Sequence, residues 1–165
     1  LKGRSGSGKT TVLNLLSGLD RPDHGHISVA GRDLDHATDN ELLALRREAV
    51  ATIHQNFALL PLLTAEENVG VPLRIGLVPT RERDRLVAGL LERSGLSDHA
   101  KQHPDELSGG QMQRVAIARA LAQQPRVLLA DEPTGQLDTH TGRTVMALLR
   151  ELVDTDGVRR HAIIE

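Results

Sequence analysis

A glycine-rich segment at the start of the chain has the residue types of a phosphate-binding loop. Residues 3–10 read Gly-Arg-Ser-Gly-Ser-Gly-Lys-Thr, which fits the spacing G-x-x-x-x-G-K-[ST]. Glycines let successive main-chain N–H groups turn inward onto phosphate oxygens, and the helix that follows adds the positive end of its dipole. Lys9 is expected to reach the β- and γ-phosphates of a nucleotide, and the Thr10 hydroxyl to bind Mg²⁺. A flexible glycine turn without a ligand is the alternative.

The nucleotide-binding residues expected from this loop are Gly3, Arg4, Ser5, Gly6, Ser7, Gly8, Lys9, Thr10 and Thr11.

Two adjacent acidic residues end a short apolar run further along the chain. Residues 127–130 read Val-Leu-Leu-Ala, as in a buried parallel strand, and Asp131 and Glu132 follow directly. Ligands of α/β proteins bind beyond the carboxyl ends of such strands, so Asp131 is expected to hold Mg²⁺. Glu132 is expected to polarise the attacking water. A solvated acidic turn with no role is the alternative, which the glycine-rich loop makes less attractive.

A third motif is Ser108-Gly109-Gly110-Gln111. Ser-x-x-Gln has the spacing of a capping box, so the motif is expected to begin a helix. Two glycines in the first turn lower helix stability by about 1 kcal/mol each. They are useful where a ligand such as a phosphate must approach the main-chain N–H groups closely. The motif therefore has both a structural and a ligand-binding interpretation.

The elements expected to position these residues alternate between helices and strands. Apolar spacing predicts a helix over residues 9–19, a strand over residues 49–53, and helices over residues 109–123 and about 145–153. Capping-box spacing predicts further helix starts at Thr38 and Thr64. Residues 26–30 resemble a short strand. Residues 158–165 have some strand character, but Arg159, Arg160 and His161 argue against it.

The middle of the chain differs in character from both ends. Between Gln55 and Leu107 there are four prolines with short helical stretches between them. We therefore expect one α/β domain over residues 1–165, with a core formed by residues 1–55 and 109–165 and a mainly helical subdomain formed by residues 56–108.

The composition excludes several classes of protein. The chain has 165 residues, a formal net charge of -2 and no cysteine. Bulk-charge binding of nucleic acid, a disulfide framework and a cysteine nucleophile receive no support. Aromatic residues make up 1% of the chain, so stacking of a base or sugar has almost no ring to use. Neither a secretory signal nor a membrane span is recognisable.

Taken in order, these motifs resemble the ATP-binding subunits of ABC transporters. The resemblance covers nearly the whole chain and is carried by residues 3–10, Gln55, residues 107–111, residues 127–132 and Leu137-Asp138. It implies a P-loop NTPase (RecA-like) α/β core with a helical signature subdomain, and hydrolysis of ATP with Mg²⁺. Gln55 resembles the Q-loop glutamine, which contacts Mg²⁺ and assists catalysis. Asp138 resembles the aspartate that communicates across the dimer, although a helix N-cap explains it equally well.

The same resemblance implies the partners. Two subunits pair head to tail, with ATP between the phosphate loop of one and Ser108, Gly109, Gly110 and Gln111 of the other. A separate permease crosses the membrane, which places the subunit in the cytoplasm at the inner face of the cell membrane. Residues 17–22, 57–61, 63–69 and 130–135 are most similar to the lipoprotein-release and macrolide-export class, LolD- and MacB-like and close to FtsE.

Departures from the family pattern leave alternatives open. Only two residues precede the phosphate loop, and the family's adenine-stacking aromatic and switch histidine are not assigned in this chain, which suggests truncation at both ends. An FtsE-like regulator of a membrane partner and a truncated copy with impaired ATPase activity therefore remain as alternatives. A chromosome-type ATPase is disfavoured because no long coiled coil separates Lys9 from Asp131.

Overall fold

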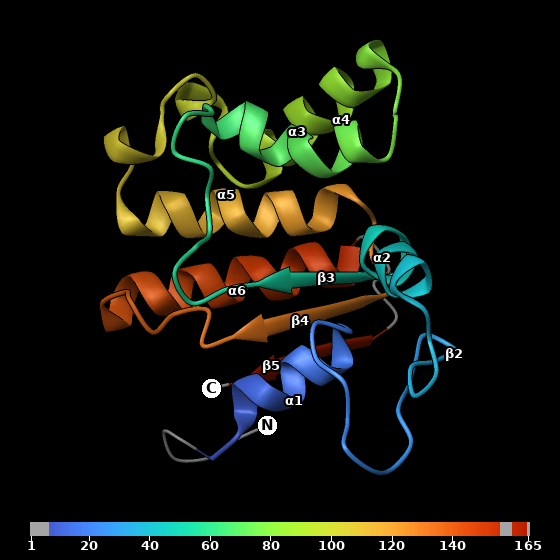
Figure 1. The fold of residues 1–165 in the computed structure, drawn as a ribbon. Helices are drawn as coiled ribbons and strands as arrows, with labels where there is room; N and C mark the ends of the chain where they lie inside the picture. Colours follow the sequence, from blue (N-terminus) through green and yellow to red (C-terminus); the bar gives the residue numbers. More distant parts are fainter. Residues whose placement is uncertain (1–6, 156–159, 165) are drawn as a thin grey trace.

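The computed structural model describes residues 7–155 and 160–164, with residues 153–155 and 160–164 described by their backbone alone. The expected loop residues Gly3, Arg4, Ser5 and Gly6 lie outside this range. The described part is an α/β fold, as the sequence predicts (Figure 1).

The centre of the fold is a parallel sheet of three strands in the order β3-β4-β5. β3 (Val50–Ile53) pairs with β4 (Val127–Asp131) from Val50 opposite Val127 to Ile53 opposite Ala130. β4 pairs in turn with β5 (Arg160–Ile164). The argument against a strand at the end of the chain was therefore wrong. Pairing with a central strand overrides the low strand preference of the charged residues, as tertiary context often does.

Helices cover both sides of the sheet, and the arrangement can be followed in Figure 1. The helices are α1 (Lys9–Leu16), α2 (Asp39–Glu48), α3 (Ala65–Ile75), α4 (Thr80–Arg93), α5 (Gly109–Ala122) and α6 (Thr139–Thr155), with short 3₁₀ turns η1 (Ser97–His99) and η2 (Pro104–Glu106). A two-stranded hairpin, β1 (Ser28–Val29) and β2 (Arg32–Asp33), precedes α2.

Alternate residues of the strands face two separate cores. Ala51, Ile53 and Leu128 belong to a large core that includes residues of α3, α4, α5 and α6. Val50 and Leu129 belong to a smaller core with residues of α1, α2 and the hairpin. This alternation follows from the period of two along a strand. The sheet is thus buried on both faces, which explains its continuous apolar runs.

The helical segment between β3 and α5 is stacked outside α5 rather than on the sheet. α3 and α4 pack on each other and on α5 (Figure 1). Thr64 begins α3 with the predicted capping box to Glu67. Pro72 lies inside α3, so the expectation that prolines separate short helices was wrong at this position. Proline has no main-chain N–H, so one intrahelical hydrogen bond is missing there, and α3 nevertheless continues to Ile75.

Candidate functional site

The carboxyl ends of the strands meet the start of α1 at one edge of the sheet (Figure 1). Gly8 precedes α1 with a φ of 82°, a left-handed conformation that glycine adopts without strain. No side chain caps α1 and no acidic residue occupies its first turn. The positive end of the α1 dipole therefore faces this edge, an arrangement suited to an anion.

Thr10 and Asp131 lie in contact although 121 positions separate them in the sequence. The Thr10 hydroxyl donates a hydrogen bond of 2.9 Å to Oδ2 of Asp131. Asp131 is the last residue of β4, so its carboxylate lies at the carboxyl end of that strand, in contact with the first turn of α1. A hydroxyl and a carboxylate at this separation are oxygen ligands of the kind Mg²⁺ takes.

Glu132 is held by two of the other predicted residues. The Lys9 ammonium nitrogen lies 3.6 Å from its Oε1, and the Gln55 amide donates to its Oε2 at 3.3 Å. Glu132 has a φ of 42°, which is uncommon for a residue with a side chain and is found preferentially at functional sites. Lys9 is nearly buried, with a side-chain exposure of 10%, whereas Glu132 is partly exposed. The site can therefore present a shielded cation and a solvent-facing carboxylate to one ligand.

These groups surround one cavity of about 380 Å³. Its lining among the described residues consists of Ser7, Gly8, Lys9, Thr10, Thr11, Gln55, Asp131 and Glu132. These eight were all predicted as site residues, seven from motifs and Gln55 from the family resemblance. The structure thus brings together the end of the glycine-rich segment, Gln55 and the acidic pair.

The donor set fits Mg²⁺ and a nucleoside triphosphate. Mg²⁺ usually takes one or two carboxylates or hydroxyls and completes its octahedron with phosphate oxygens and water. Within the part of the chain that the structure describes, no group of three or more His, Cys, Asp or Glu side chains could hold a metal. Thr10 and Asp131, which are in contact at 2.9 Å, would hold Mg²⁺ together with the nucleotide, and Gln55 also brings an amide oxygen to this cavity.

The Ser108–Gln111 motif does not line this cavity. The Ser108 hydroxyl caps α5 by accepting a hydrogen bond from the Gln111 N–H, and the Gln111 side-chain oxygen accepts one from the Ser108 N–H, so the predicted capping box is present. A Cβ on Gly110 would lie 2.6 Å from Cγ2 of Thr141 at the start of α6. Close packing within the chain is thus one reason for glycine here, and it is independent of any phosphate.

Asp138 acts as the N-terminal cap of α6. Its Oδ1 accepts hydrogen bonds from the N–H groups of His140 and Thr141 at 3.0 and 3.1 Å. Hydrogen bonds from the hydroxyl and the N–H of Thr141 lower the pKa of Asp138. The structure thus confirms that Asp138 is a helix N-cap. Capping does not conflict with a further role in a dimer.

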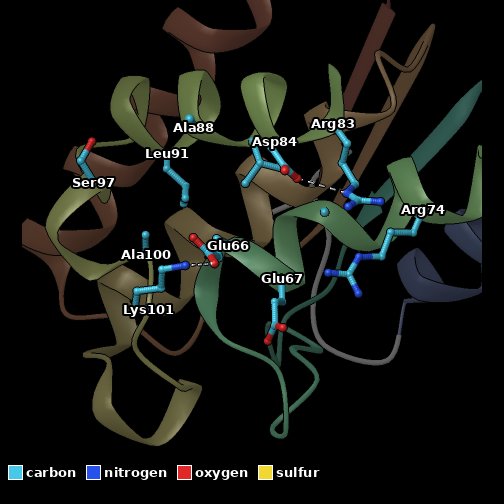
Figure 2. Close-up of a pocket in the computed structure, with 12 residues that line it drawn as sticks. Glu66, Glu67, Arg74, Arg83, Asp84, Ala88, Leu91, Ser97, Ala100 and Lys101 are labelled. Carbon is cyan, nitrogen blue, oxygen red and sulfur yellow. Dashed lines mark hydrogen bonds and ion pairs between the residues drawn. The ribbon is translucent and has the colours of Figure 1, made fainter. Parts of the chain in front are cut away.

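A second cavity, of about 420 Å³, lies between α3, α4 and η1 (Figure 2). Its charged lining residues are balanced in sign: Glu66, Glu67, Asp84, Arg74, Arg83 and Lys101. Lys101 pairs with Glu66, and Arg83 with Asp84 at 3.5 Å. Because these charges neutralise each other locally, the cavity between α3, α4 and η1 has no net charge that would bind an anion or a cation strongly. The smaller cavity at Lys9 is the chemically organised one.

Two polar side chains that hold the segment after Gln55 were not predicted from the sequence. Arg119 on α5 donates to the carbonyls of Ala58 and Phe57 at 2.7 and 2.9 Å. Asn68, completely buried on α3, exchanges hydrogen bonds with the main chain of Leu60 and also donates to Leu63. Their residue types carry no local signal for such contacts. The one indication in the sequence is that each of these polar residues stands within the apolar pattern of a buried helix.

The fold and this cavity define a P-loop nucleotide-binding α/β protein. A family model described as ABC transporter matches residues 1–135. The chain therefore belongs to the ABC transporter family, whose members bind ATP and couple it to transport.

Individual relatives include both exporters and importers. The chain is 50% identical over 150 residues to the pyoverdine export ATP-binding/permease protein PvdT of Pseudomonas fluorescens, covering 91% of this chain and 23% of PvdT. It is 48% identical to an uncharacterized ABC transporter ATP-binding protein of Thermotoga maritima, covering 91% of this chain and 64% of that protein. It is 46% identical to the methionine import ATP-binding protein MetN of Brucella abortus, covering 91% of this chain and 40% of MetN. The chain thus spans less than two thirds of the length of each.

Solved structures agree with this assignment. The fold matches the dimeric structure of a post-hydrolysis state of the ATP-binding cassette MJ0796 bound to ADP and Pi, with a TM-score of 0.87 and 41% identity over 99% of this chain and 72% of that one. A second dimeric structure of MJ0796, described as a bacterial ABC transporter cassette, matches with a TM-score of 0.86, 42% identity and the same coverage of the two chains.

Proposed function

We propose that this chain is the ATP-binding and ATP-hydrolysing part of an ABC transporter of the lipoprotein-release and macrolide-export class. The observation that supports this most is the convergence of Lys9, Thr10, Gln55, Asp131 and Glu132 on one cavity. Family membership implies ATP hydrolysis in general. The division into a core of residues 1–55 and 109–165 and a helical subdomain of residues 56–108 is part of this proposal.

Each side chain has a role that follows from its position. Lys9 would leave Glu132 and bind the β- and γ-phosphates, for which an ammonium is a strong partner. Thr10 and Asp131 would hold Mg²⁺, which would supply charge neutralisation on the phosphates during transfer. Glu132 would accept the proton of the attacking water, and Gln55, which now bonds to Glu132 at 3.3 Å, would orient that water and contribute to the metal site. Catalysis is then mostly positioning and charge stabilisation.

A second copy of the subunit would complete the site. Ser108–Gln111 begins α5 and does not reach the cavity at Lys9 in its own chain. Head-to-tail pairing would bring this motif of one subunit onto the nucleotide of the other, with Asp138 near the contact. Dimeric structures of the similar cassette MJ0796 support this arrangement.

The remaining partner in the proposal is a membrane permease. Among the described residues, no helix is both long enough and apolar enough to cross a membrane. An open, mainly apolar groove between the two parts of the fold includes Leu19, Leu60, Pro72 and Ile75. Leu19, Leu60 and Ile75 expose 58%, 45% and 63% of their surface, which is high for apolar residues and typical of a covered interface. We assign this groove to a permease at the inner face of the cell membrane, as the ATP-binding/permease name of PvdT suggests.

Two experiments test the proposal. Equilibrium binding of labelled ATP, with and without Mg²⁺, to the complete protein and to residues 1–165 separates an active domain from a truncated copy with impaired activity. Tight Mg²⁺-dependent binding by both supports the proposal, and no binding by the complete protein contradicts it. Transport by the protein reconstituted with the permease encoded beside it separates an exporter from an FtsE-like regulator, which would hydrolyse ATP without moving a substrate.

A further inference from the structure

The turn that follows Gln55 has an unfavourable backbone conformation. Phe57 and Ala58 have φ values of 60° and 48°, in the left-handed region that residues with a Cβ seldom adopt. Main-chain bonds here are local, from Phe57 N–H to His54 and from Ala58 N–H to Asn56. Two consecutive residues of this kind persist only where the surroundings hold them. Something outside the turn must therefore stabilise it.

The guanidinium of Arg119 meets this requirement. Its Nη1 donates to the carbonyl of Ala58 at 2.7 Å and its Nη2 to the carbonyl of Phe57 at 2.9 Å. One planar group thus holds both strained residues, a geometry that a single ammonium cannot reproduce. Burial lowers the pKa of Arg119, and within the described residues it forms no ion pair with a carboxylate. Its hydrogen bonds to Phe57 and Ala58 both fall on this turn.

Arg119 also connects the turn to helix α5. It lies on α5, which starts at the Ser108 cap, and α5 packs directly on β3. Gln55 lies two residues beyond the end of β3 and two residues before Phe57. The position of the Gln55 amide is thus fixed on one side by the sheet and on the other by the turn that Arg119 holds.

We infer that Arg119 is a positioning residue for Gln55: its guanidinium fixes the left-handed turn at Phe57 and Ala58, and through it the position of the Gln55 amide beside Glu132. This inference rests on the proposed function, because it assigns a consequence for ATP hydrolysis to the position of Gln55. It also makes a statement about the ligand-free protein that can be tested separately.

The variants are chosen to separate this role from general stability. Arg119→Met removes all the donors and keeps much of the side-chain length, whereas Arg119→Lys keeps one donating nitrogen in place of the guanidinium. Gln123→Met is the matched control, because Gln123 is the C-cap of α5, one turn beyond Arg119, and also donates to main-chain carbonyls. Its acceptors belong to Val50, the first residue of β3, and to Arg46 on α2, whereas Gln55 follows the last residue of β3.

The first measurement is amide hydrogen exchange in the complete protein without nucleotide. We expect exchange of a peptide covering residues 55–62 to be about tenfold faster in Arg119→Met and unchanged in Gln123→Met. Arg119→Lys should lie between the two. Unchanged exchange in Arg119→Met would overturn the inference, because the turn would then not depend on the guanidinium.

The second measurement is steady-state hydrolysis of ATP combined with nucleotide binding. We expect Arg119→Met to lower kcat by about ten- to a hundredfold, as loss of a group that orients a ligand residue does. The dissociation constant for ATP should change by less than about twofold, because Arg119 does not contact the phosphate loop. Gln55→Ala and the double variant Gln55→Ala/Arg119→Met should have the same kcat. Additive losses would overturn the inference, because Arg119 would then act independently of Gln55.

A third variant keeps the test decisive if Arg119→Met folds poorly. Glycine adopts a φ near 50° without strain, so Ala58→Gly in the Arg119→Lys background should restore part of the lost kcat. If kcat is not restored, and the Arg119 variants also lose both ATP affinity and thermal stability, then Arg119 has a purely structural role. If Glu132→Gln hydrolyses ATP as fast as the wild type, the proposed function fails. If Glu132→Gln is inactive and the cycle with Gln55 is additive, this inference alone fails.

Discussion

The Lys9 ammonium nitrogen lies 3.6 Å from Oε1 of Glu132, so the cation of the phosphate loop and the carboxylate beyond β4 form an ion pair. Gln55 bonds to the other oxygen of the same carboxylate. In the proposed reaction Lys9 must exchange this partner for phosphate oxygens. The ion pair with Glu132 therefore competes with the phosphates for Lys9.

The first prediction concerns nucleotide affinity. Replacing Glu132 by Gln removes both the competition for Lys9 and the repulsion between a carboxylate and the phosphates. We expect the dissociation constant for ATP to fall about fivefold, equivalent to about 1 kcal/mol, which is the interaction of two unit charges about 4 Å apart in bulk water. Fluorescence titration with labelled ATP measures this, with Glu92→Gln on the exposed side of α4 as control. Weaker binding by Glu132→Gln would contradict the competition.

The second prediction concerns Gly110. A Cβ at this position would lie 2.6 Å from Cγ2 of Thr141, so Gly110→Ala should destabilise the fold by about 2 kcal/mol through overpacking. Thr141→Ser removes Cγ2 and keeps the hydroxyl. In that background Gly110→Ala should be neutral or slightly stabilising, because alanine favours a helix more than glycine does. Urea unfolding of the four proteins checks this, and equal effects in both backgrounds would show that Thr141 is not the cause.

The third prediction concerns Asn68. This completely buried side chain satisfies the main chain of Leu60, Leu63 and Thr64 at the end of the segment that follows Gln55. Asn68→Leu leaves several of these groups unsatisfied and should lower the free energy of unfolding by about 3 kcal/mol. The exposed Asn56→Ala is the control and should change it by less than about 0.5 kcal/mol. A small effect of Asn68→Leu would mean that the segment finds water or other partners.

The fourth prediction concerns pH and the β1–β2 hairpin. A hydrogen bond and the charge of Asp35, with the charge of Asp33, raise the pKa of His26 above its ordinary value of 6.5. Hydrogen bonds from the N–H of Ile27 and from His26 lower the pKa of Asp35. The contribution of His26 to stability is thus fully present below pH 6.5 and is lost as the pH rises through its raised folded-state pKa. That of Asp35 is lost as the pH falls through its lowered pKa.

NMR titration of the His26 ring protons checks this directly. The midpoint should lie above 6.5 in the wild type and move toward 6.5 in Asp35→Asn. A wild-type midpoint at or below 6.5 would contradict the contact with Asp35.

The site was largely predictable because most of its residues belong to short sequence motifs. Lys9, Thr10 and Asp131 each follow a local pattern, and the rule that parallel strands present ligand residues at their carboxyl ends places them together. The predicted starts of α3 and α5 were confirmed for the same reason, since a capping box involves only neighbours in the sequence.

Features that depend on distant contacts were not predictable. Arg119 bonds to residues 61 and 62 positions away, and nothing near it in the sequence indicates them. Phe57 and Ala58 adopt a conformation usually given to glycine, so no turn signal marks them. β5 forms because β4 offers it a pairing edge, although its own residues include Arg160 and His161. In each case the energy comes from a partner that the local sequence does not specify.

The most direct test of the account is hydrolysis of MgATP by the complete protein with its permease, compared between the wild type and Glu132→Gln. Because Glu132 is proposed to accept the proton of the attacking water, we expect Glu132→Gln to lower kcat by about a hundredfold or more while still binding ATP. Equal rates of hydrolysis by the two proteins, under conditions where both bind ATP, would contradict the assignment of Glu132 and with it the proposed mechanism.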